Sequence, residues 1–446
     1  MSVFLCSKCN SQFPKWLGQC PECGAWGLIT EQSSVNLVKQ GNQKSSNGGL
    51  VKFDQIENQD FPKLKTRIEE IDRVLGEGMV PSSLILLGGQ PGIGKSTLAL
   101  QIVGQFSDHP VFYVSGEESL SQVQSRVKRL GIQTTNLGFL GETDIDVIVS
   151  TIKKNKPRLV VIDSIQTVSS HSLSTAAGNV NQIRIVISKL REIAIDTKSI
   201  ILIIGQVTKE GSVAGPKALE HLVDVVLYLD GDANQHFRFL RAIKNRFGST
   251  QEIGVFDMKE KGLMEVKNPS EIFLANRNPE TSGSVITSVI EGRRSFLVEV
   301  QALVSKTNFG YPQRKSSGFD LSRLSLLVAV LTKRLNLNLN NQDIHINIAG
   351  GLKVKEPAID LGVSLAIISA FRNKPIQENY AVFGEVGLAG EIRSVSFVEK
   401  RIQECLKMGF TKIICPLDSK LSDKKEILPV KNLKEVVIEL EKNSKQ

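Results

Sequence analysis

The sequence lacks any long apolar run. No stretch of its 446 residues approaches the roughly 18 to 20 consecutive apolar residues that a membrane-spanning helix requires. Residues 1–6 also lack the basic stretch and the long apolar core of a secretory signal. We therefore expect a soluble, cytoplasmic protein without a membrane partner.

Acidic residues are in deficit. The chain has 46 Asp and Glu residues against 55 Lys and Arg residues, which gives a formal net charge of +9. Such a balance attracts anions, nucleic acid among them, but surplus lysines also form an ordinary solvated surface. Charge alone therefore permits a nucleic-acid partner without requiring one.

Cysteine is scarce and unevenly placed, since four of the six cysteines fall within the first 23 residues. They form two Cys-x-x-Cys pairs, Cys6 with Cys9 and Cys20 with Cys23. Two such pairs can hold one Zn²⁺ in a tetrahedral site, and a cytoplasmic location disfavours disulfides. The pattern predicts a zinc ribbon over residues 1–30. Four sulfur ligands leave no open position on the metal, so the zinc is expected to be structural.

Two features surround this ribbon. Trp16 and Trp26 flank the second cysteine pair, and we expect them to cover the metal site rather than to read a base, because so small a ribbon has little other core. Residues 31–60 are expected to be a flexible linker. Their first part, 31–49, is rich in Gln, Ser, Asn and Lys, a composition that cannot bury enough apolar surface to fold.

What the sequence does contain is a phosphate-loop motif, G-x-x-x-x-G-K-S, from Gly89 to Ser96. An apolar run precedes it and a helical pattern follows, as the motif requires. Its glycines let backbone N–H groups surround phosphates at the positive end of a helix. The motif predicts a site for ATP and Mg²⁺, with Lys95 against the β- and γ-phosphates and the Ser96 hydroxyl on the metal. The expected cofactor-binding residues are Gly89, Gln90, Pro91, Gly92, Ile93, Gly94, Lys95, Ser96 and Thr97.

Further along, apolar strands alternate with helical patterns, which predicts an α/β domain over residues 61–270 with a mostly parallel sheet. Such sheets bind ligands at the carboxyl ends of their strands. Asp163 ends one apolar run and has the form of a carboxylate that holds Mg²⁺ through water, with a helix cap as the alternative. Glu117 follows another strand and is the candidate to orient or deprotonate the attacking water, with Glu118 as the alternative.

This order of features resembles the RecA-like core of recombinases and DnaB-type helicases, and the likeness implies that Gln206 is a γ-phosphate sensor. The resemblance narrows to the RadA (Sms) family of bacterial DNA-repair proteins and covers essentially the whole chain apart from the linker. It is carried by the zinc-ribbon cysteines, the phosphate loop, Tyr113–Ser119, Val207–Gly211 and the pentapeptide Lys244–Gly248, K-N-R-F-G, which is the most specific of these elements.

The resemblance implies a DNA-dependent ATPase that forms a ring, expected to be hexameric, and works as a helicase. Such a protein translocates on single-stranded DNA and promotes branch migration and strand exchange in recombinational repair. The implied cofactors are ATP, Mg²⁺ and Zn²⁺, and the implied partners are single-stranded and branched DNA and the RecA recombinase. Loops corresponding to Ser164–Asn181 and Val207–Leu219 touch single-stranded DNA in RecA-like rings. The alternative is an ATPase that loads or remodels a recombinase without translocating.

The signature pentapeptide offers two cations. Lys244 and Arg246 follow an expected strand two residues apart and can project the same way. In a ring, they could act on the γ-phosphate of a neighbouring subunit, as an arginine finger does. They could instead contact the DNA backbone together with Arg238 and Arg241, or be solvated charges at a strand end. The sequence leaves these alternatives open.

Residues 271–446 resemble the proteolytic domain of Lon, on the segments 350–361 and 383–393. This raises an ATP-dependent protease as a further candidate. Lon proteases need a serine in the segment that corresponds to Lys355–Leu361, and that segment contains none. The nearest is Ser364, inside an apolar run where burial is expected. We therefore expect a C-terminal α/β, Lon-protease-like domain that is inactive as a peptidase and serves oligomerisation and DNA binding.

Overall fold

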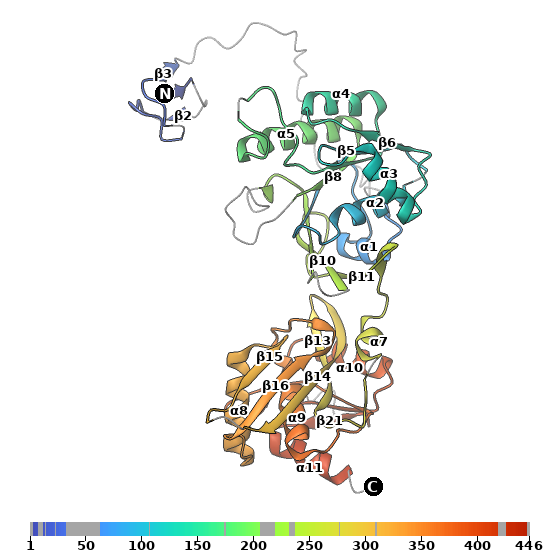
Figure 1. Cartoon of the computed structure of the whole chain (residues 1–446), viewed down its shortest axis with the longest axis vertical. Helices are drawn as coiled ribbons and strands as arrows, with labels where there is room; N and C mark the ends of the chain where they lie inside the picture. Colours follow the sequence, from blue (N-terminus) through green and yellow to red (C-terminus); the bar gives the residue numbers. More distant parts are fainter. Residues whose placement is uncertain are drawn as a thin grey trace, which may run out of the picture. The chain divides into compact units, whose positions relative to one another are not determined.

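The computed structural model describes residues 3–7, 12–13, 15–22, 24–32, 63–106, 108–173, 175–205, 219–231, 237–275, 277–307, 310–417 and 425–443. The chain divides into two units, Met1–Asp60 and Phe61–Gln446 (Figure 1). Within the described ranges, no helix has the length and apolar character needed to cross a membrane.

The first unit contains a small antiparallel sheet in the order β2-β1-β3. Its strands are β1 (Val3–Cys6), β2 (Gln12–Phe13) and β3 (Ile29–Gln32). Cys6 and Cys20 are fully buried, and their small core is completed by Ile29 with Phe4, Phe13 and Leu17 packed against it. Cys9 and Cys23, the partners expected from the sequence, lie outside the described residues. The two described cysteines therefore share one buried cluster.

The expectation that two tryptophans cover the cysteines is wrong. Trp16 and Trp26 are 59% and 74% exposed. The Trp16 indole N–H donates to the backbone carbonyl of Ile29 at 3.0 Å, which holds the ring at the rim of the ribbon. The phenylalanines and leucine named above supply the apolar cover, so the ribbon has more core than its sequence suggested.

The second unit begins with a nine-stranded sheet in the order β12-β11-β10-β9-β4-β8-β7-β5-β6. Its strands are β4 (Leu84–Gly89), β5 (Val111–Ser115), β6 (Leu137–Leu140), β7 (Leu159–Asp163), β8 (Ile200–Ile204), β9 (Val225–Asp230), β10 (Phe237–Asn245), β11 (Ile253–Lys259) and β12 (Gly262–Glu265). The strands from β9 to β6 in this order run parallel, and β10, β11 and β12 are antiparallel. A mostly parallel sheet is thus confirmed.

Helices cover both faces of this sheet (Figure 1). They are α1 (Glu69–Leu75), α2 (Lys95–Gln105), α3 (Leu120–Leu130), α4 (Ile145–Asn155) and α5 (Val180–Thr197). Successive residues of a strand point to opposite faces. In β4, Ile85 and Leu87 accordingly join the core under α1, α2 and α3, whereas Leu84 and Leu86 join the core under α4 and α5. Burial on both faces explains why the central strands are continuous apolar runs.

A second sheet, of seven strands, has the order β15-β16-β14-β13-β17-β20-β21. Its strands are β13 (Ser284–Glu291), β14 (Arg294–Lys306), β15 (Arg314–Ser317), β16 (Gln342–Ile348), β17 (Tyr380–Val382), β20 (Lys412–Pro416) and β21 (Ile427–Val430), and β18 (Glu385–Val386) pairs with β19 (Ile392–Arg393) beside it. The accompanying helices are α7 (Pro269–Leu274), α8 (Leu321–Leu335), α9 (Asp360–Arg372), α10 (Val398–Lys407) and α11 (Leu433–Asn443). The C-terminal α/β domain expected from the sequence is therefore present.

The two sheets are joined by ion pairs at the turn between β13 and β14. Arg294 Nη1 donates to Glu70 Oε2 of α1 at 2.7 Å, and the Glu70 side chain is only 1% exposed. The same oxygen accepts the backbone N–H of Val255 in β11 at 2.9 Å. Nearby, Arg241 of β10 pairs with Glu291 at 2.6 Å. Glu70 is thus a buried charge whose partners come from both sheets.

We expect Glu70→Gln to lower the free energy of unfolding by about 3 kcal/mol, because it leaves the Arg294 charge without its partner in a largely buried place. Urea denaturation of the full chain measures the change. Glu69→Gln is the matched control. The Glu69 side chain is 67% exposed, and its ion pair with Lys267 is a solvent-exposed one at 3.5 Å, so its loss should change the free energy of unfolding by less than about 0.5 kcal/mol. Equal midpoints for the two variants would contradict the role given to Glu70.

Candidate nucleotide site and the cavity of the C-terminal domain

The phosphate loop connects β4 to α2. Lys95, the first residue of α2, is 7% exposed, and its Nζ donates to the backbone carbonyls of Gly89 and Gln90, each at 2.9 Å. Gly94 has φ +114°, and a Cβ there would lie 2.6 Å from Met258 Cε. Only glycine therefore suits this turn. Burial lowers the pKa of Lys95, and the charges of Asp163 and Glu117 oppose that shift.

Asp163, at the end of β7, lies next to this loop. It is 6% exposed, and Tyr113 Oη of β5 donates to its Oδ2 at 2.5 Å. Burial raises the pKa of Asp163, and hydrogen bonds from Tyr113 and from Ser96 lower it in opposition. The carboxylate accepts from these two hydroxyls, which come from other elements. A hydroxyl beside a carboxylate is a ligand set that suits Mg²⁺, so these side chains fit the metal expected from the sequence.

The two neighbouring glutamates after β5 have different partners. Glu118 accepts two hydrogen bonds from Arg126 of α3, at 2.6 and 2.8 Å, so both of its carboxylate oxygens are bound by one arginine. Glu117 accepts one hydrogen bond, from Ser164 Oγ at 2.5 Å. Ser164 is 1% exposed and directly follows Asp163. Glu117 is therefore the glutamate with an oxygen left for a further contact among the described residues.

Sequence reasoning missed the supporting residues of this site, Tyr113, Ser164 and Arg126. Each is close in the chain to a residue that was predicted, but each contacts a group on another element. One signal was available for Tyr113, since it is a polar-tipped residue in an otherwise apolar, buried strand. Gln206 and the segment 207–218 lie outside the described residues.

Lys244 and Arg246 lie away from their own phosphate loop. In the register of the sheet, Lys244 pairs with Val226, which in turn pairs with Leu86, three residues before Gly89. Lys244 Nζ donates to the backbone carbonyls of Glu220 and Val223, and Arg246 Nη1 donates to Asp224 Oδ1 at 2.9 Å. Within one chain, both cations are therefore engaged near the turn before β9.

The suggestion that Arg238 reaches the DNA backbone is wrong. Arg238 is 4% exposed, and its Nε donates to the carbonyl of Ile93 in the phosphate loop at 3.2 Å. Alternation along β10 turns this side chain into the protein. Arg241, the other arginine of that suggestion, forms the ion pair with Glu291 described above.

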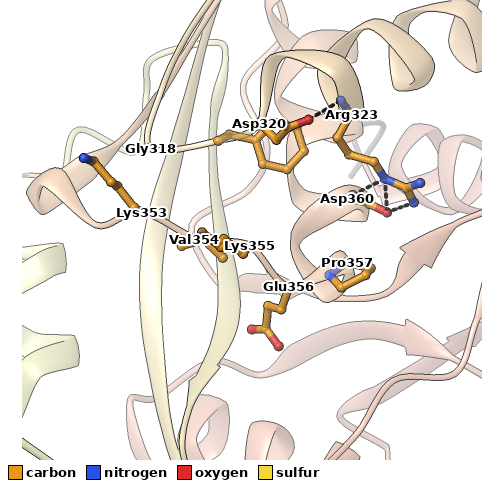
Figure 2. A pocket seen from close by; sticks show the side chains of 10 residues that line it. Gly318, Asp320, Arg323, Lys353, Val354, Lys355, Glu356, Pro357 and Asp360 are labelled. Carbon is orange, nitrogen blue, oxygen red and sulfur yellow. Dashed lines mark hydrogen bonds and ion pairs between the residues drawn. The ribbon is translucent and has the colours of Figure 1, made fainter. Parts of the chain in front are cut away.

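The C-terminal domain contains a cavity of about 570 Å³, and part of its lining comes from the segment Lys355–Leu361, in which the resemblance to Lon implies a serine for a peptidase. Figure 2 shows the side chains around it, with Arg323 of α8 hydrogen-bonded to Asp360 of α9. The lining residues are Gly318, Phe319, Asp320, Arg323, Lys353, Val354, Lys355, Glu356, Pro357 and Asp360, none of which is a serine, threonine or cysteine. Ser364 is fully buried in α9, and its Oγ has no partner within the described part of the chain.

A phosphate loop on a mostly parallel sheet, with Asp163 and Glu117 at the ends of adjacent strands, defines a RecA-like P-loop ATPase. A family model for an AAA domain matches residues 52–212, which agrees with this class. Two further models match other parts of the chain: subunit ChlI of Mg-chelatase matches residues 325–419, and a rubredoxin metal-binding domain matches residues 4–31. The last match includes all four N-terminal cysteines, which supports a zinc ribbon.

Curated relatives extend over nearly the whole chain. DNA repair protein RadA of Bacillus subtilis (strain 168) is 48% identical over 427 residues, covering 93% of this chain and 92% of the relative. DNA repair protein RadA of Rickettsia bellii (strain RML369-C) is 46% identical over 428 residues, covering 94% of each chain. The chain belongs to the RadA family of DNA repair proteins. Among solved structures, the RadB recombinase is 24% identical and covers 46% of this chain and 100% of its own, with a TM-score of 0.38, too low to support an argument.

We expect Tyr113→Phe to move the acid limb of the pH–rate profile for ATP hydrolysis to higher pH. Burial already raises the pKa of Asp163, and loss of the Tyr113 hydrogen bond disfavours the ionised carboxylate further. Protonated Asp163 cannot hold Mg²⁺, so the rate relative to wild type should be on the order of tenfold lower near pH 6 than near pH 8. Tyr228→Phe, on β9, is the control. Parallel profiles for Tyr113→Phe and wild type would refute this role.

Proposed function

We propose that this chain is a DNA-dependent ATPase that assembles into a hexameric ring and translocates on single-stranded DNA as a DnaB-type helicase. In this role it promotes branch migration and strand exchange in recombinational repair. One observation carries the proposal: Lys95, Ser96, Asp163 and Glu117 meet at the carboxyl ends of β4, β5 and β7 in a member of the RadA family. Single-stranded and branched DNA and the RecA recombinase are the proposed partners.

The contacts of each site residue suit a particular role in ATP hydrolysis. Lys95 Nζ, now on two loop carbonyls, would transfer its hydrogen bonds to the β- and γ-phosphate oxygens of ATP. Ser96 and Asp163 would hold Mg²⁺, which supplies positive charge beside the phosphates when bound. Glu117, steadied from one side by Ser164, would orient the attacking water. Gln206 is proposed as the γ-phosphate sensor.

A ring is proposed because, among the described residues, the two cations of the signature pentapeptide lie away from the phosphate loop of their own chain. Arg246 is exposed at 52% of its side chain, and only its Nη1 has a partner in the described ranges. A guanidinium has five N–H donors, so Arg246 keeps donors for a neighbouring subunit. An arginine finger places its positive charge beside the γ-phosphate bound to a neighbouring subunit and stabilises the negative charge there.

An alternative from another class is an ATPase that loads or remodels a recombinase without moving along DNA. We expect the wild-type protein to separate the strands of forked DNA when ATP is present. Lys95→Ala should retain the fold and lose ATP hydrolysis by at least about a hundredfold, because the phosphates lose their buried cation, and strand separation should be lost with it. ATP consumption by the wild type without strand separation would favour the alternative, and normal hydrolysis by Lys95→Ala would remove the phosphate loop from the mechanism.

A Lon-type ATP-dependent protease is the third candidate function. The described lining of the C-terminal cavity has no serine, threonine or cysteine, so we expect no casein degradation by the wild type with ATP. Ser364→Ala should leave the free energy of unfolding unchanged or raise it by up to about 1 kcal/mol, because it removes a buried hydroxyl that lacks a hydrogen bond. Casein assays and urea denaturation measure these outcomes. Casein degradation that disappears in Ser364→Ala would overturn the assignment.

A further inference from the structure

A buried arginine contacts the phosphate loop from the sheet. Arg238, the second residue of β10, is 4% exposed. Its partner on β11 is Phe256, which is fully buried, and Leu240, two residues further along β10, belongs to the core under α1, α2 and α3. Alternate residues of a strand share a face of the sheet. The guanidinium of Arg238 therefore lies on the face that carries the phosphate loop and α2.

The hydrogen bonds of Arg238 join two backbone segments. Its Nε donates to the carbonyl of Ile93 at 3.2 Å, and its Nη1 donates to the carbonyl of Phe237 at 2.9 Å. The chain after β9 passes close to the same side chain, since a Cβ at Gly231 would lie 2.8 Å from Arg238 Cδ. A hydrogen bond from a charged donor is stronger than one between neutral groups. Arg238 thus connects its own strand to the loop through charge-assisted hydrogen bonds.

The phosphate loop is closely packed where Arg238 contacts it. The Ile93 side chain is 3% exposed. A Cβ at Gly94 would lie 2.6 Å from Met258 Cε of β11, and a Cβ at Gly89 would lie 2.6 Å from the carbonyl oxygen of Leu229 in β9. Such packing limits how far the loop can move, but it is not directional. The hydrogen bond from Arg238 adds the direction, because it fixes the way in which one carbonyl points.

The carbonyl that Arg238 binds belongs to the peptide between Ile93 and Gly94. The C=O and N–H of a planar trans peptide point in opposite directions, so the Gly94 N–H points away from Arg238. Gly94 is the N-cap of α2, where backbone N–H groups have no partner within the helix. In a phosphate loop, these N–H groups bind the α- and β-phosphates. A hydrogen bond to the carbonyl also polarises the peptide and makes its N–H a better donor.

Lys95 binds the same loop in a different way. Its Nζ donates to the carbonyls of Gly89 and Gln90, and in the proposed function it leaves them for the β- and γ-phosphates. Arg238 binds the side of the Ile93–Gly94 peptide opposite to its N–H, so its hydrogen bond is compatible with a bound nucleotide. The two cations are therefore suited to different parts of the nucleotide.

We propose that Arg238 is a positioning residue for nucleotide binding, which fixes the Ile93–Gly94 peptide so that N–H groups of the loop hold the α- and β-phosphates. ADP and ATP share these phosphates, so Arg238 contributes equally to the affinity for both. It acts neither on the attacking water nor on the γ-phosphate. The inference rests on the proposed function in taking the phosphate loop as the ATP site. The contacts that carry it lie within one chain.

Nucleotide affinity and hydrolysis kinetics test this role in the full chain. In Arg238→Met, the Kd values for ADP and for a non-hydrolysable ATP analogue should both rise at least about tenfold, and by the same factor within about twofold. The KM for ATP should rise with them while kcat changes less than about twofold, because the lost interaction is made equally in the ground state and the transition state. Arg238→Lys keeps a charged donor and should recover part of the affinity. Unchanged affinities, or a fall in kcat alone, would overturn the proposal.

Hydrogen exchange tests the positioning without a nucleotide. The Ile93 N–H donates to the carbonyl of Gln90 at 3.3 Å within the loop. In Arg238→Met this amide should exchange at least about fivefold faster than in wild type. Arg129→Met is the matched control for both experiments, since Arg129 is an exposed arginine in the last turn of α3. Wild-type protection in β4 will establish that each variant is folded, and Arg238→Gln replaces Arg238→Met if the latter does not fold. Unchanged exchange at Ile93 would contradict the proposal.

Lys95→Ala distinguishes a failure of this inference from a failure of the proposed function. Because Lys95 reaches the γ-phosphate, Lys95→Ala should weaken binding of the ATP analogue by a larger factor than binding of ADP, in contrast to the equal factors expected for Arg238→Met. If Lys95→Ala is impaired but Arg238→Met binds both nucleotides like wild type, the proposed function stands and the role of Arg238 is refuted. If Lys95→Ala also binds both like wild type, the loop is not the ATP site, and the two proposals fail together.

Discussion

The buried carboxylate of Asp163 is the group around which the candidate nucleotide site is arranged. It lies at the end of a strand that is buried on both faces, so its charge must be balanced by side chains from neighbouring elements. Tyr113 and Ser96 provide the hydrogen bonds. The charge of Glu117 raises the pKa of Asp163, and the charge of Asp163 in turn raises the pKa of Lys95. The parallel order of β5, β7, β8 and β4 brings these groups to one edge. The same burial that makes the sheet stable therefore concentrates its polar groups where phosphates and Mg²⁺ can bind.

Sequence patterns predicted the parts of this arrangement that are encoded locally. The phosphate loop and the apolar strands each follow from the order of residues within a short window. Contacts between distant segments were not predictable in this way. The hydrogen bond between Ser164 and Glu117 joins residues 47 positions apart, and no periodicity reports it. Arg238 was misjudged for a related reason, because a charged residue in a strand was taken as exposed when its partner is a backbone carbonyl of the phosphate loop.

In the C-terminal domain, ion pairs surround the cavity beside α9. The cavity lies at the start of α9, and two carboxylates of its lining are held in ion pairs. Asp360 is fully buried and bound by Arg323, and Glu356 is bound by Arg401, which is itself fully buried. These ion pairs hold the segments around the cavity together, and removing either partner leaves an uncompensated charge. These two charged residues of the cavity lining thus contribute to the stability of the domain.

Lys244 and Arg246 are only two positions apart, but within one chain they have different partners. Adjacent cations invite a single explanation, but the distances assign them to different atoms. Lys244 is withdrawn into a turn whose carbonyls need positive charge, and Arg246 shares Asp224 with Arg191 while exposing most of its remaining donors. Because Asp224 also accepts from the first residue of β4, a movement of Arg246 toward a neighbour would loosen the same aspartate that binds this strand.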